Sequence, residues 1–185
     1  TLRRSSAASD VYKRQGSMLF AHEVPLSGGD TLFASMYKAY DTLSDGLKST
    51  LSNLRARHSS VHVFGAARAE KGNDDTVGRI KNPEAATQEA IHPVVISHPE
   101  TGRKSLYVNP GFTLGFEGWS DEESKPLLEY LYAHAARPEF TCRFQWKEGS
   151  IAFWDNRATW HLAVNDYQGS RRMMHRITIE GTPLS

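Results

Sequence analysis

The last third of the chain constrains the fold most, because several short strands follow one another there at close spacing. Apolar and polar residues alternate over residues 140–146, which predicts a strand with one buried face. Further strands are predicted over residues 151–154, 159–164 and 171–179, with short turns between them. Such a run of strands favours a β-sandwich or jelly roll with helices packed outside it.

The earlier part of the chain carries more strand patterns and two helical ones. Strands are predicted over residues 17–24, 30–33, 93–98 and 104–109. Apolar residues at helical spacing over residues 40–54 predict a helix that is interrupted near Ser44. Ser120 and Glu123 form a capping box, which predicts a helix running through residue 136 that Pro126 should kink.

Two segments lack such patterns. Residues 65–90 are rich in Gly, Ala, Asn and charge, which predicts a loop or mobile lid. Residues 1–15 are basic and show no apolar period, and residues 10–15 resemble translated adapter sequence. We interpret residues 1–15 as a non-native or disordered segment and residues 16–185 as the domain.

Composition excludes several classes of protein. The 185 residues include one cysteine, Cys142, which excludes a disulfide framework and a thiolate zinc site. The formal net charge is +1, so no global charge recruits nucleic acid or an anionic membrane. No stretch approaches the roughly 18 apolar residues of a membrane span. We therefore expect a cytoplasmic domain with no nucleic-acid or membrane partner.

The most informative segment is the last predicted strand. Side chains alternate across a strand, so one face holds Arg172, Met174, Arg176 and Thr178. The other face is apolar enough to be packed and holds Met173, His175, Ile177 and Ile179. If the strand is central, the two guanidiniums need anions, and their Cα atoms lie about 13 Å apart. Two bound carboxylates, or a carboxylate and a sulfonate, would satisfy them; internal salt bridges or an exposed edge are the alternative.

Other polar residues carry weaker signals. His161 lies on an apolar strand, where a histidine is more often a hydrogen-bonded core residue than a metal ligand. Thr31 follows a Gly-Gly turn, where its hydroxyl either faces an anion or fills the turn. His98 with Glu100 is the one His-x-carboxylate spacing among the eight histidines, and its Pro/Gly setting favours an ordinary hairpin turn.

Seven segments in this order resemble a known family. They are residues 28–31, 39–43, 92–95, 98–102, 108–113, 154–161 and 171–176. Together they are similar to the taurine dioxygenase (TauD/TfdA) branch of the Fe(II)/2-oxoglutarate-dependent dioxygenases, over essentially all of residues 17–185. The resemblance implies a mainly β fold with flanking helices (α+β), a double-stranded β-helix or jelly roll, incomplete at its N-terminus.

The resemblance also implies roles for five residues. His161 matches the distal iron ligand of the family. Arg172 matches the arginine that binds the distal carboxylate of 2-oxoglutarate, and Thr31 the hydroxyl beside it. Arg176 matches the arginine that holds a substrate sulfonate, and Phe112 an aromatic wall of that pocket. The implied metal and co-substrate are Fe(II) and 2-oxoglutarate, and no further catalytic residue is implied.

The chain departs from the family at the other two iron ligands. The family supplies them from a His-x-Asp motif, which at the family's spacing would fall near Arg4 and Ser6. Neither residue type can complete a two-histidine, one-carboxylate triad. We therefore expect the chain as written to bind Fe(II) poorly and to be inactive.

The resemblance implies an enzyme that uses O₂ and a small sulfonate or other anionic substrate. The activity expected first is hydroxylation of taurine or a related sulfonate with release of sulfite, by a homo-oligomer. Two alternatives remain: a metal-free anion-binding pseudoenzyme, and a sister oxygenase that acts on alkyl sulfates or aryloxyacetates.

Overall fold

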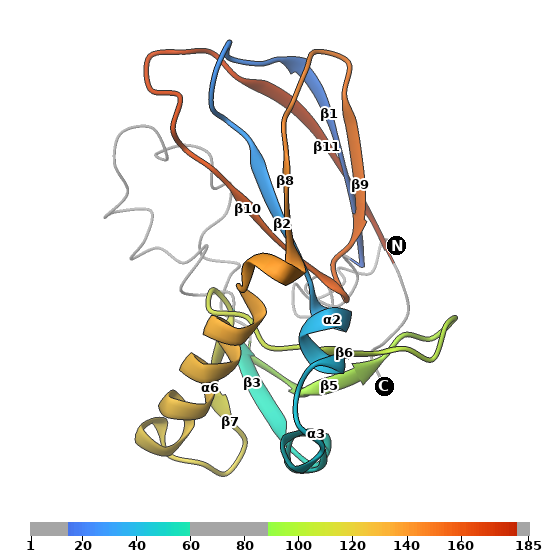
Figure 1. The fold of residues 1–185 in the computed structure, drawn as a ribbon, viewed down its shortest axis with the longest axis vertical. Helices are drawn as coiled ribbons and strands as arrows, with labels where there is room; N and C mark the ends of the chain where they lie inside the picture. Colours follow the sequence, from blue (N-terminus) through green and yellow to red (C-terminus); the bar gives the residue numbers. More distant parts are fainter. Residues whose placement is uncertain (1–14, 60–88, 181–185) are drawn as a thin grey trace, which may run out of the picture.

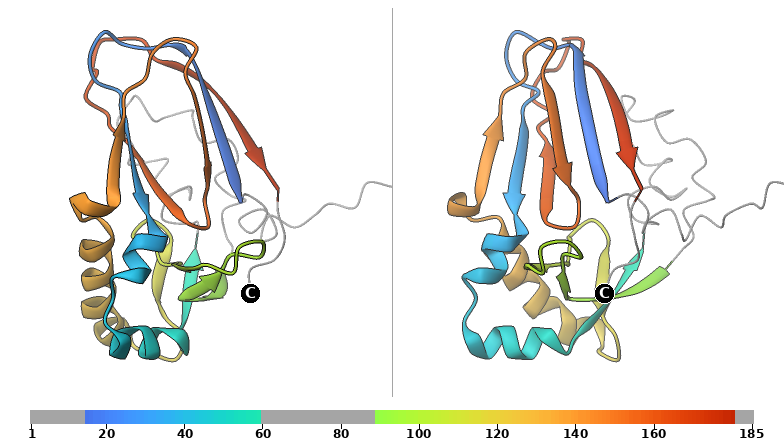
Figure 2. Two further views of the ribbon diagram at one scale, coloured as in Figure 1. Left: turned by 45° about the vertical axis from the view of Figure 1, so that its right-hand side comes forward. Right: turned by 90° about the vertical axis from the view of Figure 1, so that its right-hand side faces the viewer.

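Two antiparallel three-stranded sheets face each other in the upper part of the molecule (Figure 1). The computed structural model describes residues 15–59 and 89–180. One sheet has the order β11-β1-β9, from Met173–Ile179, Gly16–Glu23 and Ile151–Asp155. The other has the order β10-β2-β8, from Thr159–Ala163, Thr31–Ser35 and Thr141–Phe144. In the right-hand view of Figure 2, the strands of each sheet lie next to one another.

Aromatic side chains fill the space between these sheets. Trp154 of β9 contacts Phe33 of β2, with ring centroids 5.2 Å apart. Phe144 of β8 lies edge-on to Phe33 and to Trp146. A large aromatic side chain typically removes about 150–250 Å² of surface from water when it is buried. This pair of facing sheets is the predicted jelly-roll architecture, and the mainly β prediction is confirmed.

Helices and short strands form the lower part of the molecule. A third sheet has the order β4-β3-β7, from Glu89–Pro93, Arg55–Ser59 and Thr113–Phe116. Strands β5 (Val95–Ser97) and β6 (Lys104–Leu106) form a hairpin. The helices are α2 (Met36–Asp41), α3 (Asp45–Ser52) and α6 (Asp121–Ala135), and a 3₁₀ turn covers Pro138–Phe140.

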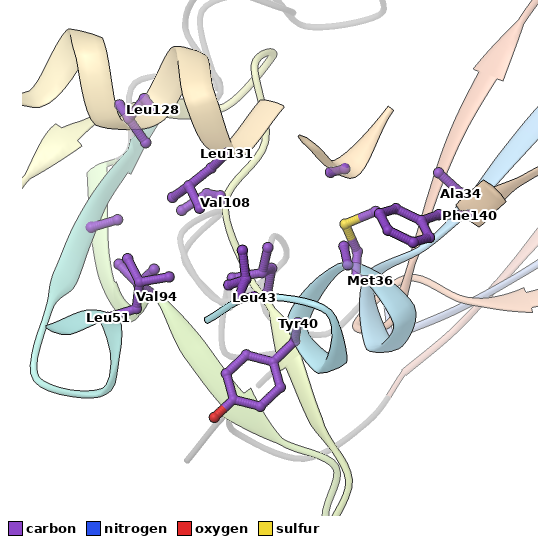
Figure 3. Close-up of a cluster of buried hydrophobic side chains, with 14 of the residues drawn as sticks. Ala34, Met36, Tyr40, Leu43, Leu51, Val94, Val108, Leu128, Leu131 and Phe140 are labelled. Atoms are coloured by element: carbon purple, nitrogen blue, oxygen red, sulfur yellow. The ribbon is translucent and has the colours of Figure 1, made fainter. Parts of the chain in front are cut away.

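A second hydrophobic cluster holds these elements together (Figure 3). Leu128 and Leu131 of α6 point toward Val108 and Val94, and Leu51 of α3 closes the cluster from the opposite side. Leu51, Leu131 and Val94 are fully buried. Burying each such side chain contributes about 1.5–3 kcal/mol, so the helices are anchored to the sheet β4-β3-β7 by packing.

Capping residues set the helix boundaries as predicted. The helical pattern over residues 40–54 is interrupted at Ser44, whose Oγ accepts a hydrogen bond from Leu47 N and begins α3. Ser120 and Glu123 form a complete capping box at the start of α6. Helix α6 runs from Asp121–Ala135 with Pro126 in its second turn. The strands of the β4-β3-β7 sheet were not predicted, apart from one residue of β4.

Two expectations about the last strand are wrong for the part of the chain that the structure describes. Strand β11 lies at the edge of its sheet, and β1 is the central strand. The face expected to be packed is open: Met173, Ile177 and Ile179 are 45%, 52% and 41% exposed. The alternation was read correctly, but no described element covers this face.

Several expectations lie outside the described residues. These are the segment 1–14 and most of the loop predicted over 65–90, of which the structure describes only β4 from Glu89 onward. Among the helices described, none is both long and apolar enough to cross a membrane.

Candidate anion-binding site between the sheets

Arg172 is a half-buried cation without a partner anion among the described residues. It lies directly before β11, and its Cζ is 5.8 Å from the ring centroids of both Trp146 and Tyr167. Its Nε and Nη2 atoms are buried and make no hydrogen bond. A guanidinium cannot lose its proton, and burying it unpaired is costly. Arg172 therefore presents a two-nitrogen fork that a carboxylate would satisfy.

Thr31, the first residue of β2, shares the neighbour Trp146 with Arg172. It is 1% exposed, and its Oγ1 accepts a hydrogen bond of 3.0 Å from Trp146 Nε1. Trp146 thus contacts both Thr31 and Arg172. The Thr31 hydroxyl has a proton of its own to donate, which suits it to an anionic oxygen. Sequence reasoning predicted a buried Trp146 but not this role.

The Gly-Gly turn before β2 makes room for Arg172. Gly28 and Gly29 have φ of 80° and 71°, a backbone conformation that glycine adopts without steric cost. A Cβ on Gly29 would lie 3.2 Å from the Cδ and Nε atoms of Arg172. Gly29 N donates to Asp166 Oδ1 at 2.7 Å, and Asp30 pairs with Arg143 at 2.8 Å. These two contacts hold the turn in place next to the Arg172 guanidinium.

Arg176 lies on the same strand, and its side chain meets β1. It pairs in register with Leu19, and its Nη2 donates to Ser17 Oγ at 3.0 Å. By contrast, Arg171 points away from the interior and pairs with Glu23 at 3.5 Å on the surface. The alternation predicted from sequence thus places Arg172 and Arg176 on one face, away from Arg171.

His161 of β10 faces the same interior. Its ring lies on Trp154, with centroids 4.9 Å apart. The residue has an exposed edge, yet loss of surrounding water lowers its pKa to about 4, and the positive charge of Arg176 lowers it further. A neutral imidazole is the form that binds a metal. The structure therefore brings His161 close enough to Arg176 for the two charges to interact.

The donor set around His161 does not fit iron by itself. Across residues 15–59 and 89–180, no group of three His, Cys, Asp or Glu side chains could hold a metal ion. A facial site for Fe(II) needs two histidines and a carboxylate. The described residues thus supply one candidate ligand, His161.

His98 belongs to a different cluster, at the tip of the β5–β6 hairpin. His98 Nε2 lies 3.0 Å from Asp155 Oδ2 and 2.9 Å from Arg157 Nη2. Burial raises the pKa of Asp155, but hydrogen bonds from Arg157 and His98 outweigh it and lower the net pKa. Because Gly102 N donates to the carbonyl of His98, the predicted hairpin turn is confirmed. The cluster fastens the hairpin to the β9–β10 turn.

Phe112 lies in the turn before β7. Its N–H donates to Asn109 O, and its carbonyl accepts from Ser59 N at 2.8 Å. These backbone contacts belong to the lower part of the molecule. A place for the Phe112 ring beside Arg176 stays a prediction.

The fold and site together define a jelly-roll protein with two arginines, Arg172 and Arg176, on one face of its last strand and its approach. The chain belongs to the family described as taurine catabolism dioxygenase TauD, TfdA, whose model matches residues 11–178.

Individual relatives agree with this assignment. An alkylsulfatase from Acinetobacter baylyi is 40% identical over 159 residues, which cover 85% of this chain and 50% of the relative. An alpha-ketoglutarate-dependent sulfate ester dioxygenase from Pseudomonas putida is 34% identical, covering 90% of this chain and 55% of the relative. The crystal structure of a taurine dioxygenase from Burkholderia xenovorans superposes with a TM-score of 0.74 at 37% identity, covering 91% and 53%. The chain thus spans about half the length of these relatives.

Proposed function

We propose that this chain carries the 2-oxoglutarate-binding and substrate-anion-binding part of an Fe(II)- and 2-oxoglutarate-dependent dioxygenase. Its substrate is a small sulfonate or sulfate ester. One observation carries the proposal: the half-buried Arg172 has two buried guanidinium nitrogens without a described partner, and Trp146 contacts both Arg172 and the hydroxyl of Thr31. The family match and the relatives' names support the reaction class.

In this proposal, Arg172 and Thr31 hold the distal carboxylate of 2-oxoglutarate. The planar fork of an arginine matches a carboxylate in geometry and charge. The rings of Trp146 and Tyr167 keep water away from the pair, which strengthens the attraction. When bound, 2-oxoglutarate supplies the two electrons that, with O₂, permit hydroxylation of a C–H bond.

Arg176 holds the anionic group of the substrate. Being four residues from Arg172 on the same face, it holds its anion at a second position along the strand. A single guanidinium accepts a sulfonate, a sulfate ester or a carboxylate. Taurine, an alkyl sulfate and an aryloxyacetate all satisfy this charge; the names of the relatives above favour the sulfur-containing pair.

The test is a metal-free calorimetric titration of 2-oxoglutarate into the chain. Arg172→Ala should weaken binding at least about 30-fold, because a buried, charge-assisted contact is lost. Arg171→Ala is the matched control: it removes the adjacent, surface-paired arginine and should leave the affinity unchanged. Equal affinities of the wild-type and Arg172→Ala proteins, or no binding by either, would refute the proposal.

A metal-free anion-binding protein is the second candidate, because the described residues supply one iron ligand only. Both candidates predict 2-oxoglutarate binding without metal and no Fe(II)-dependent succinate from this chain. The two candidates differ in what they predict once this chain is joined to the N-terminal portion of the alkylsulfatase relative. A dioxygenase then forms succinate from 2-oxoglutarate on addition of Fe(II), O₂, 2-oxoglutarate and taurine or hexyl sulfate. A pseudoenzyme forms none.

A further inference from the structure

We propose that Ser17 is a positioning residue that orients the Arg176 guanidinium toward the substrate anion. It acts in a hydrogen-bonded chain that runs from Trp154 through Asn156 and Ser17 to Arg176. This inference rests on the proposed function, in which Arg176 holds the substrate.

The sheet register places Ser17 beside Arg176. Ser17 lies on the central strand β1, opposite Thr178 of β11 on one side and Trp154 of β9 on the other. Arg176 pairs with Leu19, two residues along the strand from Ser17. Ser17 and Arg176 are thus diagonal neighbours on one face, within reach of a long side chain. Ser17 is fully buried, so water does not compete for its hydroxyl.

Both lone pairs of the Ser17 oxygen are used. Asn156 Nδ2 donates to Ser17 Oγ at 2.9 Å, and Arg176 Nη2 donates to the same atom at 3.0 Å. A serine oxygen has two acceptor positions, so no third donor is accommodated. An alanine here would leave an amide N–H and one guanidinium N–H of the exposed Arg176 without this shared acceptor.

The orientation of Asn156 is set from its other end. Asn156 Oδ1 accepts a hydrogen bond of 2.8 Å from the indole Nε1 of Trp154. The amide oxygen therefore faces Trp154, and the amide nitrogen must face Ser17. The ring of Trp154 in turn packs on His161. The chain thus links the aromatic support of His161 to the guanidinium of Arg176.

This arrangement lowers the cost of binding an anion. A free arginine side chain carries about 2 kcal/mol of rotamer entropy, part of which is lost on binding. A hydrogen bond to a rigid, buried serine restricts Arg176 before the ligand arrives. Removal of the Ser17 hydroxyl should weaken binding at Arg176 and spare the Arg172 site, which shares none of these bonds.

The experiment compares Ser17→Ala with Ser124→Ala. Ser124 is an equally buried serine in α6, whose Oγ accepts from Phe116 N in the other hydrophobic cluster. Taurine and hexyl sulfate are titrated separately into each metal-free protein with 2-oxoglutarate present. Ser17→Ala should weaken the tighter of the two probes about 10-fold and leave 2-oxoglutarate affinity within about 2-fold. Ser124→Ala should leave both affinities unchanged.

An NMR measurement tests the chain itself. The Trp154 indole N–H signal should shift in Ser17→Ala, because Asn156 loses its acceptor, and should stay in place in Ser124→Ala. The inference would be overturned by an unshifted Trp154 indole signal in Ser17→Ala. It would also be overturned if Ser17→Ala bound taurine and hexyl sulfate as the wild type does, or if the wild type bound neither. If the wild type instead showed no 2-oxoglutarate binding that depends on Arg172, the proposed function would be refuted.

Discussion

A buried pair of histidines should make the fold sensitive to mild acid. His58 of β3 and His92 of β4 lie with ring centroids 5.3 Å apart, and the ring of Tyr107 lies within 5.7 Å of both. The two histidines are 7% and 5% exposed. His58 Nδ1 lies 3.3 Å from Thr113 Oγ1. Protonation would place positive charge in this buried, aromatic setting.

Burial lowers the pKa of both rings to about 4. The second cause is the neighbouring His92 for His58, and Arg55 for His92. An unfolded histidine has a pKa of about 6.5, so the unfolded chain takes up protons first as the pH falls. Stability is therefore complete above about pH 6.5 and is lost progressively toward pH 4. Between pH 7 and pH 5 the loss is about 2 kcal/mol for each ring.

Urea denaturation at pH 7 and pH 5 measures this loss. The His58–His92 pair should contribute up to about 4 kcal/mol to the loss, less any non-additivity between the two rings, and His161 adds to the total. His58→Gln should remove about half of the pH dependence that the pair produces, because it deletes one of the two titrating rings and leaves Arg55 beside His92. The exposed His22→Gln is the control and should retain the wild-type difference. A wild type equally stable at both pH values would refute the reasoning.

Two further substitutions test the architecture of the site. Thr31→Val keeps the shape of the side chain but leaves the Trp146 indole N–H buried without its acceptor. The free energy of unfolding measured in urea should therefore fall by about 1–3 kcal/mol. A loss below about 0.5 kcal/mol would show that this hydrogen bond is not stabilising. Gly28→Ala places a Cβ 2.7 Å from Asp166 Oδ1 at a φ of 80°, so thermal denaturation should show a loss of at least about 1 kcal/mol. An unchanged Tm in Gly28→Ala would mean that the turn can rearrange.

The sequence alone predicted the features that local patterns encode. Alternation placed Arg172 and Arg176 on one face of a strand, and the structure brings Arg176 into contact with the interior that contains His161. Capping residues such as Ser44 and Ser120 marked helix starts because their hydrogen bonds join groups three residues apart. The family resemblance supplied the roles proposed for these residues.

Strands without a clear apolar face escaped prediction. Strand β3 reads Arg-Ala-Arg-His-Ser, in which Arg55 and Arg57 alternate with the buried Ala56 and His58. A charged residue at every second position suits a strand with one solvated face, but over five residues it is equally typical of a loop. The partner strand β4 follows about thirty residues later, and only their pairing brings His58 and His92 together.

The tertiary structure also decided which faces are covered and which polar side chains meet. Periodicity showed that Met173, Ile177 and Ile179 share a face, but whether another element covers that face depends on packing between distant segments. Ser17 gave no signal, because its importance comes from Asn156 and Arg176, which lie 139 and 159 residues away along the chain. Neighbouring residues in the sequence determine the direction of a side chain, whereas hydrogen bonds across the sheets determine what that side chain can do.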